Sequence, residues 1–221
     1  MWNARYFPEE VLEKSESIEE DGYLIPRLCF FLVLTYVIIY FSVWKGLKSL
    51  SQVAHITVTL PYFIQAIFLI RGLALPGASI GLKYLFVPEW SIVFEIKIWK
   101  AALIQALYST AITFGPYISF SSLRTRQDTK ILPLCMALPA ADLFSSLFAG
   151  LALFSFMGHV SDRLGVEMKD IVKGGWDLAF TAYPGLMTTL AMPNFWSLLF
   201  FVMLMMMGID SIFGCYIYII Q

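Results

Sequence analysis

The chain has 221 residues, of which 59% are hydrophobic and 14% charged, and its formal net charge at pH 7 is −1. A mean hydropathy of +0.74 excludes an ordinary soluble domain of this length, so the composition indicates a membrane protein. The near-neutral charge gives no broad basic surface, which excludes nucleic acid as a partner.

The first 23 residues form a polar and acidic segment. Residues 8–21 read PEEVLEKSESIEED, whereas a signal peptide needs a basic start followed by an apolar core. We therefore expect residues 1–23 to be an extramembrane segment and not a cleavable signal.

Five apolar runs follow, each long enough to cross a bilayer, which takes about 20 residues in a helix. In chain order they cover residues 24–44, 53–70, 98–123, 131–157 and 195–220. In hydrocarbon only helices and closed β-barrels satisfy their backbone hydrogen bonds, and these runs lack the alternation of polar and apolar residues that barrel strands show. The sequence therefore predicts an all-α membrane protein with five transmembrane helices within residues 24–221.

The short loops carry the basic residues. Lys45 and Lys48 follow the first run, and RTRQDTK at residues 124–130, with Arg124, Arg126 and Lys130, follows the third. The positive-inside rule makes these loops cytoplasmic, which places residues 1–23 and the loops 71–97 and 158–194 outside the cell.

The last of these loops contains two segments with helical patterns. DRLGVEMKDIVK and LAFTAYPGLMTTL are separated by a break at Gly174 and Gly175. The pattern fits a helical hairpin that acts as an external lid and fits an ordinary ordered loop equally well.

The third run is unusually polar for a membrane helix. Its polar residues lie within little more than two turns and are followed by a glycine and a proline, which weaken a helix: Gln105, Ser109, Thr110, Thr113, Gly115 and Pro116. Such a run indicates a discontinuous helix that lines a cavity, or a proline kink whose hydroxyls bond back to their own helix.

Two aspartates lie inside apolar runs. Asp142 precedes Ser145 and Ser146 by one turn, and Asp210 precedes Ser211. Because an aspartate at the bilayer centre costs about 2.5–3.5 kcal/mol on insertion scales, each needs a partner or a proton. No lysine or arginine of the five runs lies at matching depth. A small hard cation would satisfy Asp210, and so would protonation with a hydrogen bond to another helix.

Histidines and cysteines offer no metal site. His55 and His159 have no companions at ligand spacing and are expected at the membrane interface, and the three cysteines are expected to be buried apolar side chains.

Several blocks resemble one family. RGLALPGASIG at 71–81, GGWDLAFTAYP and GIDS at 208–211 are similar, in order and spacing, to the sodium- and chloride-dependent neurotransmitter symporters, the solute carrier 6 group. The resemblance covers nearly the whole chain but corresponds to the fourth to eighth of twelve helices. It implies a partial LeuT-type inverted-repeat bundle with one discontinuous helix, in a multi-pass protein of the plasma membrane.

The resemblance implies a transporter and not an enzyme. It suggests a sodium-coupled symporter for a neurotransmitter, amino acid or related amine that works by alternating access, with Na⁺ as the coupling ion and no cofactor. The implied sodium ligands are Met207 through its carbonyl, Asp210, Ser211, Ser109 and Asp142. The implied chloride ligands are Gln105, Ser109 and Ser146, and the implied substrate pocket contains Tyr108, Ala111, Thr113 and Phe114.

The chain departs from the family pattern at the sites themselves. STAITFG stands where the family has S-L-G-x-G-F-G, so Ala111 and Thr113 replace glycines beside the substrate. Asp142 replaces an asparagine shared by a sodium and the chloride site. Its carboxylate supplies the charge that chloride would bring, so we expect chloride dependence to be weakened or lost.

Two alternatives accompany the transporter hypothesis. The chain could be a truncated or degenerate paralogue that does not transport and associates with full-length family transporters, since the first family helix would supply much of both sodium sites. An intramembrane aspartyl protease is the other, but PAADLF and MMGIDS match neither its YD nor its GxGD motif.

Overall fold

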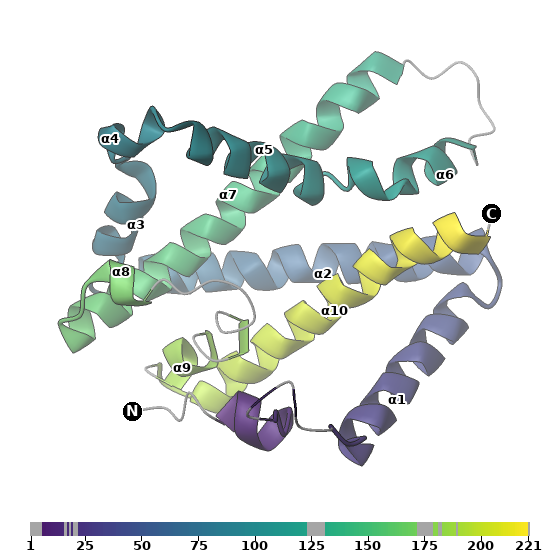
Figure 1. Ribbon diagram of the computed structural model, residues 1–221, viewed down its shortest axis with the longest axis horizontal. Coiled ribbons are helices and arrows are strands. Elements are labelled where there is room, and N and C mark those ends of the chain that lie inside the picture. Colours follow the sequence, from purple (N-terminus) through teal and green to yellow (C-terminus); the bar gives the residue numbers. More distant parts are fainter. Residues whose placement is uncertain are drawn as a thin grey trace.

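The long apolar segments are helical in the computed structural model, which describes residues 6–15, 17, 19, 22–122, 131–171, 179–180, 183–188 and 190–220. No strand occurs within these residues. Four helices contain a stretch long and apolar enough to span a membrane. They are α1 (Pro26–Val43), α2 (Leu47–Leu73), α7 (Ile131–Leu164) and α10 (Pro193–Ile220), as Figure 1 shows. The all-helical class is therefore confirmed.

The third apolar run is not one long helix. It forms α5 (Ile96–Ser109), a short 3-10 turn η2 (Ile112–Phe114) and α6 (Pro116–Ser122). Ala111 and Gly115 have left-handed backbone angles, with φ of 53° and 82°. These two residues interrupt the helix, and Pro116 begins α6 because its missing N–H costs nothing at a first helical position. The run is thus a discontinuous helix and not a simple kink.

Helix boundaries differ from the apolar runs at two loops. Gly46, with φ of 65°, turns the chain, and α2 begins at Leu47 instead of near Val53. At the other end of the molecule, α7 continues to Leu164 instead of ending near Met157. Hydropathy marks the part of a helix that lies in hydrocarbon, whereas the polar turns at its ends extend beyond it.

The loop 71–97 contains two helices, α3 (Ala78–Phe86) and α4 (Trp90–Val93). A Cβ added to Gly81 would lie 1.8 Å from the carbonyl oxygen of Phe154, so α3 packs backbone to backbone on α7. His159 lies in this contact. It is buried against the protein, and its Nδ1 is 2.8 Å from the carbonyl oxygen of Pro76. Its expected location at the membrane interface stays a prediction.

The loop 158–194 contributes to the core. Within it lie α8 (Met168–Ile171) and α9 (Tyr183–Thr188), while Gly174 and Gly175 fall outside the described residues. Leu186 and Met187 of α9 are fully buried in a cluster with residues of α2, α7 and α10, which include Phe68, Phe156 and Phe200.

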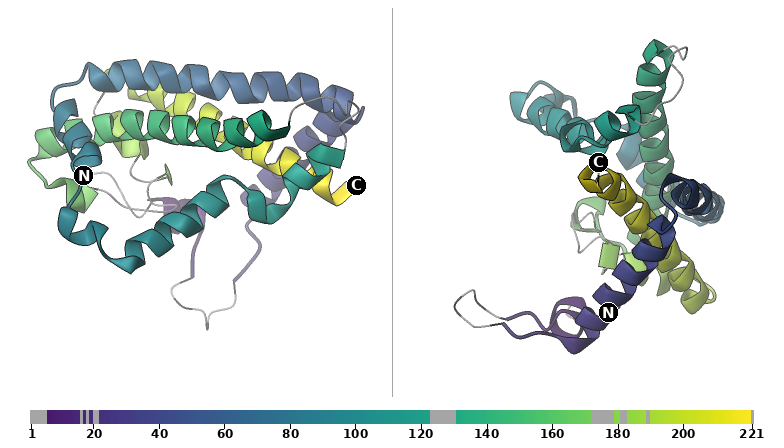
Figure 2. Two further views of the ribbon diagram at one scale, coloured as in Figure 1. Left: turned by 90° about the horizontal axis from the view of Figure 1, so that it is seen from above. Right: turned by 90° about the vertical axis from the view of Figure 1, so that its right-hand side faces the viewer.

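The long helices form a central layer. α2 contacts both α7 and α10, and α5 and α6 form an arm beside this layer (Figure 2). The turn between α1 and α2 and the C-terminus lie at one end, and α3, α8 and α9 lie at the other (Figure 1).

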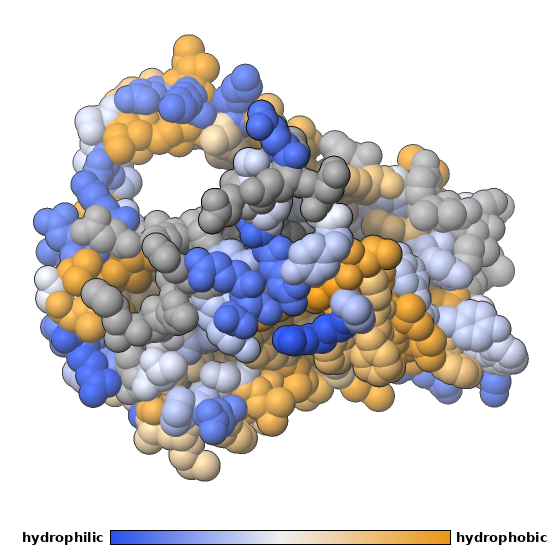
Figure 3. All heavy atoms as spheres, turned by 60° about the horizontal axis from the view of Figure 1, so that its bottom comes forward, coloured by the Kyte–Doolittle hydropathy of each residue, from blue (hydrophilic) through white to orange (hydrophobic). Residues whose placement is uncertain are grey.

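Much of the surface is apolar. Orange areas spread over the face drawn in Figure 3, and α1 exposes Phe30, Phe31, Val33 and Phe41. Cys135 and Cys215 are also exposed, so the expectation of burial is wrong for these two cysteines. A membrane protein presents apolar side chains to lipid, and hydropathy therefore does not distinguish the core from the surface.

Candidate functional site: two polar clusters between membrane helices

The first cluster surrounds Asp210 on α10. The Thr57 hydroxyl of α2 donates a hydrogen bond to the Asp210 carboxylate, and Ser211 Oγ donates to the Met207 carbonyl oxygen at 3.0 Å. A cavity of about 350 Å³ opens here between α2, α7 and α10. The described residues that line it are Thr57, Val58, Pro61, Tyr62, Gln65, Ser145, Ser146, Ala149, Met207, Asp210 and Ser211.

This cavity brings together residues that the sequence analysis placed in two different sites. Met207, Asp210 and Ser211 are three of the five predicted sodium ligands, and Ser146 was assigned to chloride. None of the described lining residues is a lysine or an arginine. The polar groups that the described lining presents to the carboxylate are therefore neutral.

Sequence reasoning missed the groups that α2 contributes to this cavity. Thr57 and Gln65 lie eight residues apart on α2, which is little more than two turns and puts them on one face. The spacing of polar residues along α2 is a signal that could have found them, but it does not identify Asp210 as their neighbour.

The second cluster joins the end of α5 to α7. Ser109 Oγ donates to Asp142 Oδ1 at 2.6 Å, and Ser145 Oγ donates to the Asp142 carbonyl oxygen at 3.0 Å. Ser109 and Asp142 are therefore in contact, as the sodium assignment requires. Because Asp142 and Ser146 are separated by about one turn of α7, about 5.4 Å along the axis, the two clusters adjoin. Gln105, assigned to chloride, is exposed on α5 and does not line the Asp210 cavity.

The four predicted substrate residues lie at the helix break. Tyr108 and Phe114 pack edge to face with ring centroids 5.6 Å apart across it, and Ala111 is the residue with the left-handed backbone. The Thr113 side chain lies outside what the structure describes. The break thus brings the rings of Tyr108 and Phe114 together.

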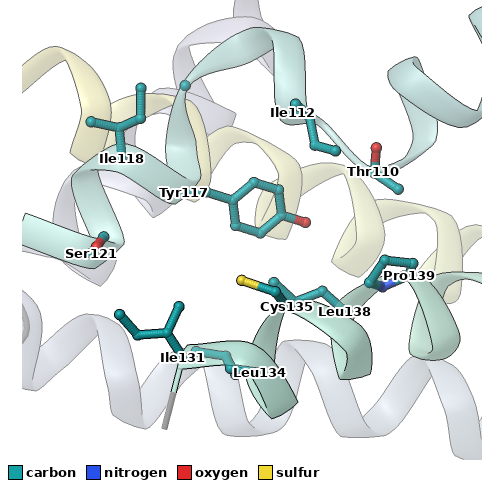
Figure 4. Close-up of a pocket in the computed structure, with 11 residues that line it drawn as sticks. Thr110, Ile112, Tyr117, Ile118, Ser121, Ile131, Leu134, Cys135, Leu138 and Pro139 are labelled. Atoms are coloured by element: carbon teal, nitrogen blue, oxygen red, sulfur yellow. The ribbon is translucent and has the colours of Figure 1, made fainter. Parts of the chain in front are cut away.

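A second cavity, of about 740 Å³, separates the break from the first half of α7 (Figure 4). Its wall is mostly apolar, with the Tyr117 ring of α6 in its centre and Cys135 of α7 opposite. Its described lining contains Thr110 and Gly115 of the break but not Tyr108, Ala111 or Phe114.

The described part of the loop 158–194 is anchored on α10. Tyr183 stacks on Phe200 with ring centroids 4.3 Å apart and planes 13° apart. Burial raises the pKa of the Tyr183 phenol above its ordinary value, so this ring stays neutral at physiological pH. An uncharged aromatic stack fastens α9 to the N-terminal half of α10.

Four long apolar helices, one broken helix and half-buried carboxylates between these helices are typical of multi-span membrane transporters. The model of the sodium:neurotransmitter symporter family matches residues 2–221, and the chain therefore belongs to this family, whose members are transporters and not enzymes.

Similar curated proteins are named as transporters. The sodium- and chloride-dependent taurine transporter of Bos taurus is 36% identical over 95% of this chain and 34% of its own length. The sodium- and chloride-dependent neutral and basic amino acid transporter B(0+) of Mus musculus is 34% identical over 96% of this chain and 33% of its own length. The chain thus spans about a third of the length of the curated relatives it matches.

Proposed function

We propose that this chain is a segment of a sodium-coupled symporter that moves an amino acid or related amine into the cell by alternating access. The observation that carries this proposal is the Asp210 carboxylate in a cavity between three membrane helices, among oxygen ligands and with no lysine or arginine among the described residues of its lining. Carboxylate, hydroxyl and carbonyl oxygens are the ligands that a hard cation prefers.

Sodium would bind at both polar clusters. Asp210, Ser211 and the Met207 carbonyl would hold one ion, and Ser109 with Asp142 would contribute to a second. Chloride would be bound by Gln105, Ser109 and Ser146. Transport would depend only weakly on this anion, because Asp142 already supplies a negative charge. The names of the relatives favour taurine and amino acids as substrates.

The broken helix would provide the substrate site. Tyr108, Ala111, Thr113 and Phe114 lie on a segment where helical hydrogen bonding is interrupted, so backbone groups are free to contact a ligand. The protein would span the plasma membrane several times, with residues 1–23 and the loop 158–194 outside, which the basic loops at Lys45, Lys48 and 124–130 support.

A thermal unfolding experiment tests the proposal. Sodium should raise the unfolding temperature of the purified chain relative to the same concentration of N-methyl-D-glucamine, since a ligand of the folded state stabilises it. Asp210→Asn should remove most of this increase, whereas Asp162→Asn, a carboxylate outside both clusters, should keep it. An equal increase in wild type and Asp210→Asn would contradict the proposal.

A second function is favoured by the exposed apolar faces of α1 and α5, where Phe30, Phe31, Trp99 and Leu103 are uncovered. Helices of a full-length family transporter could cover these faces, and the chain would then associate with such a transporter without transporting by itself. Saturable sodium-dependent uptake by the 221 residues alone, in a cell without other family members, would refute this second function.

A further inference from the structure

A third helix contributes polar groups to the Asp210 cavity. Thr57, Pro61 and Gln65 recur at intervals of four along α2, so they share one face, and all three line the cavity. The sodium ligands assigned above come only from α5, α7 and α10. The role of α2 is therefore unassigned.

Thr57 makes the direct contact. Its side chain is buried, with 5% of its surface exposed, and its hydroxyl donates to Asp210 across a sequence separation of 153 residues. The same hydroxyl oxygen lies 3.2 Å from the carbonyl oxygen of Val53, the usual position for a helical threonine that bonds back on its own helix. One hydroxyl carries one proton, and the carboxylate is the stronger acceptor because it carries charge.

The backbone near Thr57 is also unusual. Pro61 lies inside α2 and has no N–H, so the Thr57 carbonyl lacks its usual helical donor four residues later. Thr57 therefore brings two oxygens to one turn of α2, and one of them is already engaged with Asp210.

We infer that Thr57 is a positioning residue for the Asp210 site, an inference that rests on the sodium-coupled function proposed above. By holding one carboxylate oxygen, the hydroxyl fixes the orientation of Asp210 and leaves the other oxygen for the cation. Groups that hydrogen-bond to a ligating carboxylate raise affinity in this way, because the ligand is already oriented before the ion arrives. The contact also makes α2 part of the sodium site. The Asp210 carboxylate binds the ion and also joins α10 to α2, so sodium binding and the distance between these two helices depend on each other.

The test is a sodium titration of the full 221-residue chain in detergent micelles. N-methyl-D-glucamine replaces sodium so that ionic strength stays constant, and the readout is the sodium concentration that gives half of the maximal thermal stabilisation. Thr57→Val keeps the shape of the side chain and removes the donor, so it should raise this concentration roughly tenfold. Thr57→Ser restores a hydroxyl and should return it close to the wild-type value.

Thr59→Val is the matched control. Thr59 is the same residue type on the same helix, but it is exposed and does not line the cavity, so its replacement should leave the half-saturating sodium concentration unchanged. A purely structural role for Thr57 would lower the unfolding temperature in every salt without moving that concentration. If Thr57→Val does not fold, Thr57→Ala is titrated instead.

The outcomes separate the two proposals. A wild-type sodium response that the Thr57 variants leave unchanged would overturn this inference alone. A wild-type chain without any sodium response would overturn the proposed function and this inference with it. A raised half-saturating concentration that Thr57→Ser reverses would support both.

Discussion

Ala111 shows how a single residue interrupts a membrane helix. Ala111 lies between α5 and the 3-10 turn, with a φ of 53°. Glycine adopts this backbone conformation freely, whereas a Cβ disfavours it. The family pattern has glycine at this position, so Ala111 places a Cβ in a conformation that glycine would adopt without strain. The helix is nevertheless broken, because Gly115 and Pro116 interrupt it on the other side.

Replacing Ala111 should therefore release strain. A left-handed alanine costs about 1–2 kcal/mol, and glycine loses about 0.4–1 kcal/mol more unfolded-state entropy, so Ala111→Gly should raise the free energy of unfolding by up to about 1 kcal/mol. Gly115→Ala, at φ of 82°, is the opposite change, and because the same two contributions act with reversed sign it should lower the free energy of unfolding by up to about 1 kcal/mol. Equal stability of the two variants in reversible unfolding in mixed micelles would mean that the break is not strained.

Asp142 places a carboxylate where the family pattern has an amide. Its contact with Ser109 at 2.6 Å places this charge between α5 and α7, next to the residues assigned to chloride. A fixed negative charge at this point balances the charge of a sodium ion that chloride would otherwise balance.

The anion dependence of sodium stabilisation checks this role. Wild type should respond to sodium equally in chloride and in gluconate, whereas Asp142→Asn should respond only when chloride is present. A wild-type response that disappears in gluconate, or an Asp142→Asn variant that behaves like wild type, would show that the carboxylate does not replace the anion.

Charged residues of the site could be assigned from the sequence, whereas the contact between Thr57 and Asp210 could not. Asp142 and Asp210 stand out because a carboxylate in an apolar run needs a reason. Threonine is common in membrane helices, where its hydroxyl bonds back on the helix, so Thr57 and Thr59 look alike in the sequence. Only folding brings the Asp210 carboxylate to one of them.

At the scale of the elements, close packing of α3 on α7 organises the end of the molecule where α3, α8 and α9 lie. Gly81 and Gly158 let the two backbones meet, and a Cβ on Gly158 would lie 2.5 Å from the Gly81 nitrogen. Small residues that allow close approach are a common basis of helix association in membranes. The sequence indicated neither α3 nor this contact, because hydropathy reports burial in lipid and not the approach of two backbones.

Gly158→Ala should separate these two helices. The added methyl group has no space, and such overpacking costs about 1–3 kcal/mol in the free energy of unfolding. Gly150→Ala is the control on the same helix, because the nearest atom to its added Cβ is 3.9 Å away. It should be neutral or stabilising by about 0.5–1 kcal/mol, since alanine is the better helix former. Similar losses in both variants, measured by reversible unfolding in mixed micelles, would argue against a tight α3–α7 contact.

At the scale of the whole molecule, the helices surround polar clusters and leave wide apolar surfaces. The core lies among α2, α7, α9 and α10, whereas α1 and α5 expose much of their apolar side chains. Hydropathy located the apolar runs, because polar groups are costly in lipid. Four of the five predicted spans are long apolar helices in the described residues, whereas the third run is divided into α5, η2 and α6. Hydropathy did not predict how Asp210 is enclosed by α2, α7 and α10. Contacts between distant segments leave no local pattern in a chain that is apolar on nearly every face.

The central claim is that Asp210 belongs to a sodium site, and equilibrium binding of radioactive sodium to the purified chain tests it most directly. Saturable binding in wild type and in Asp162→Asn, with loss of that binding in Asp210→Asn, is the predicted result. Saturable binding that survives in Asp210→Asn, or no saturable binding in wild type, would contradict the claim.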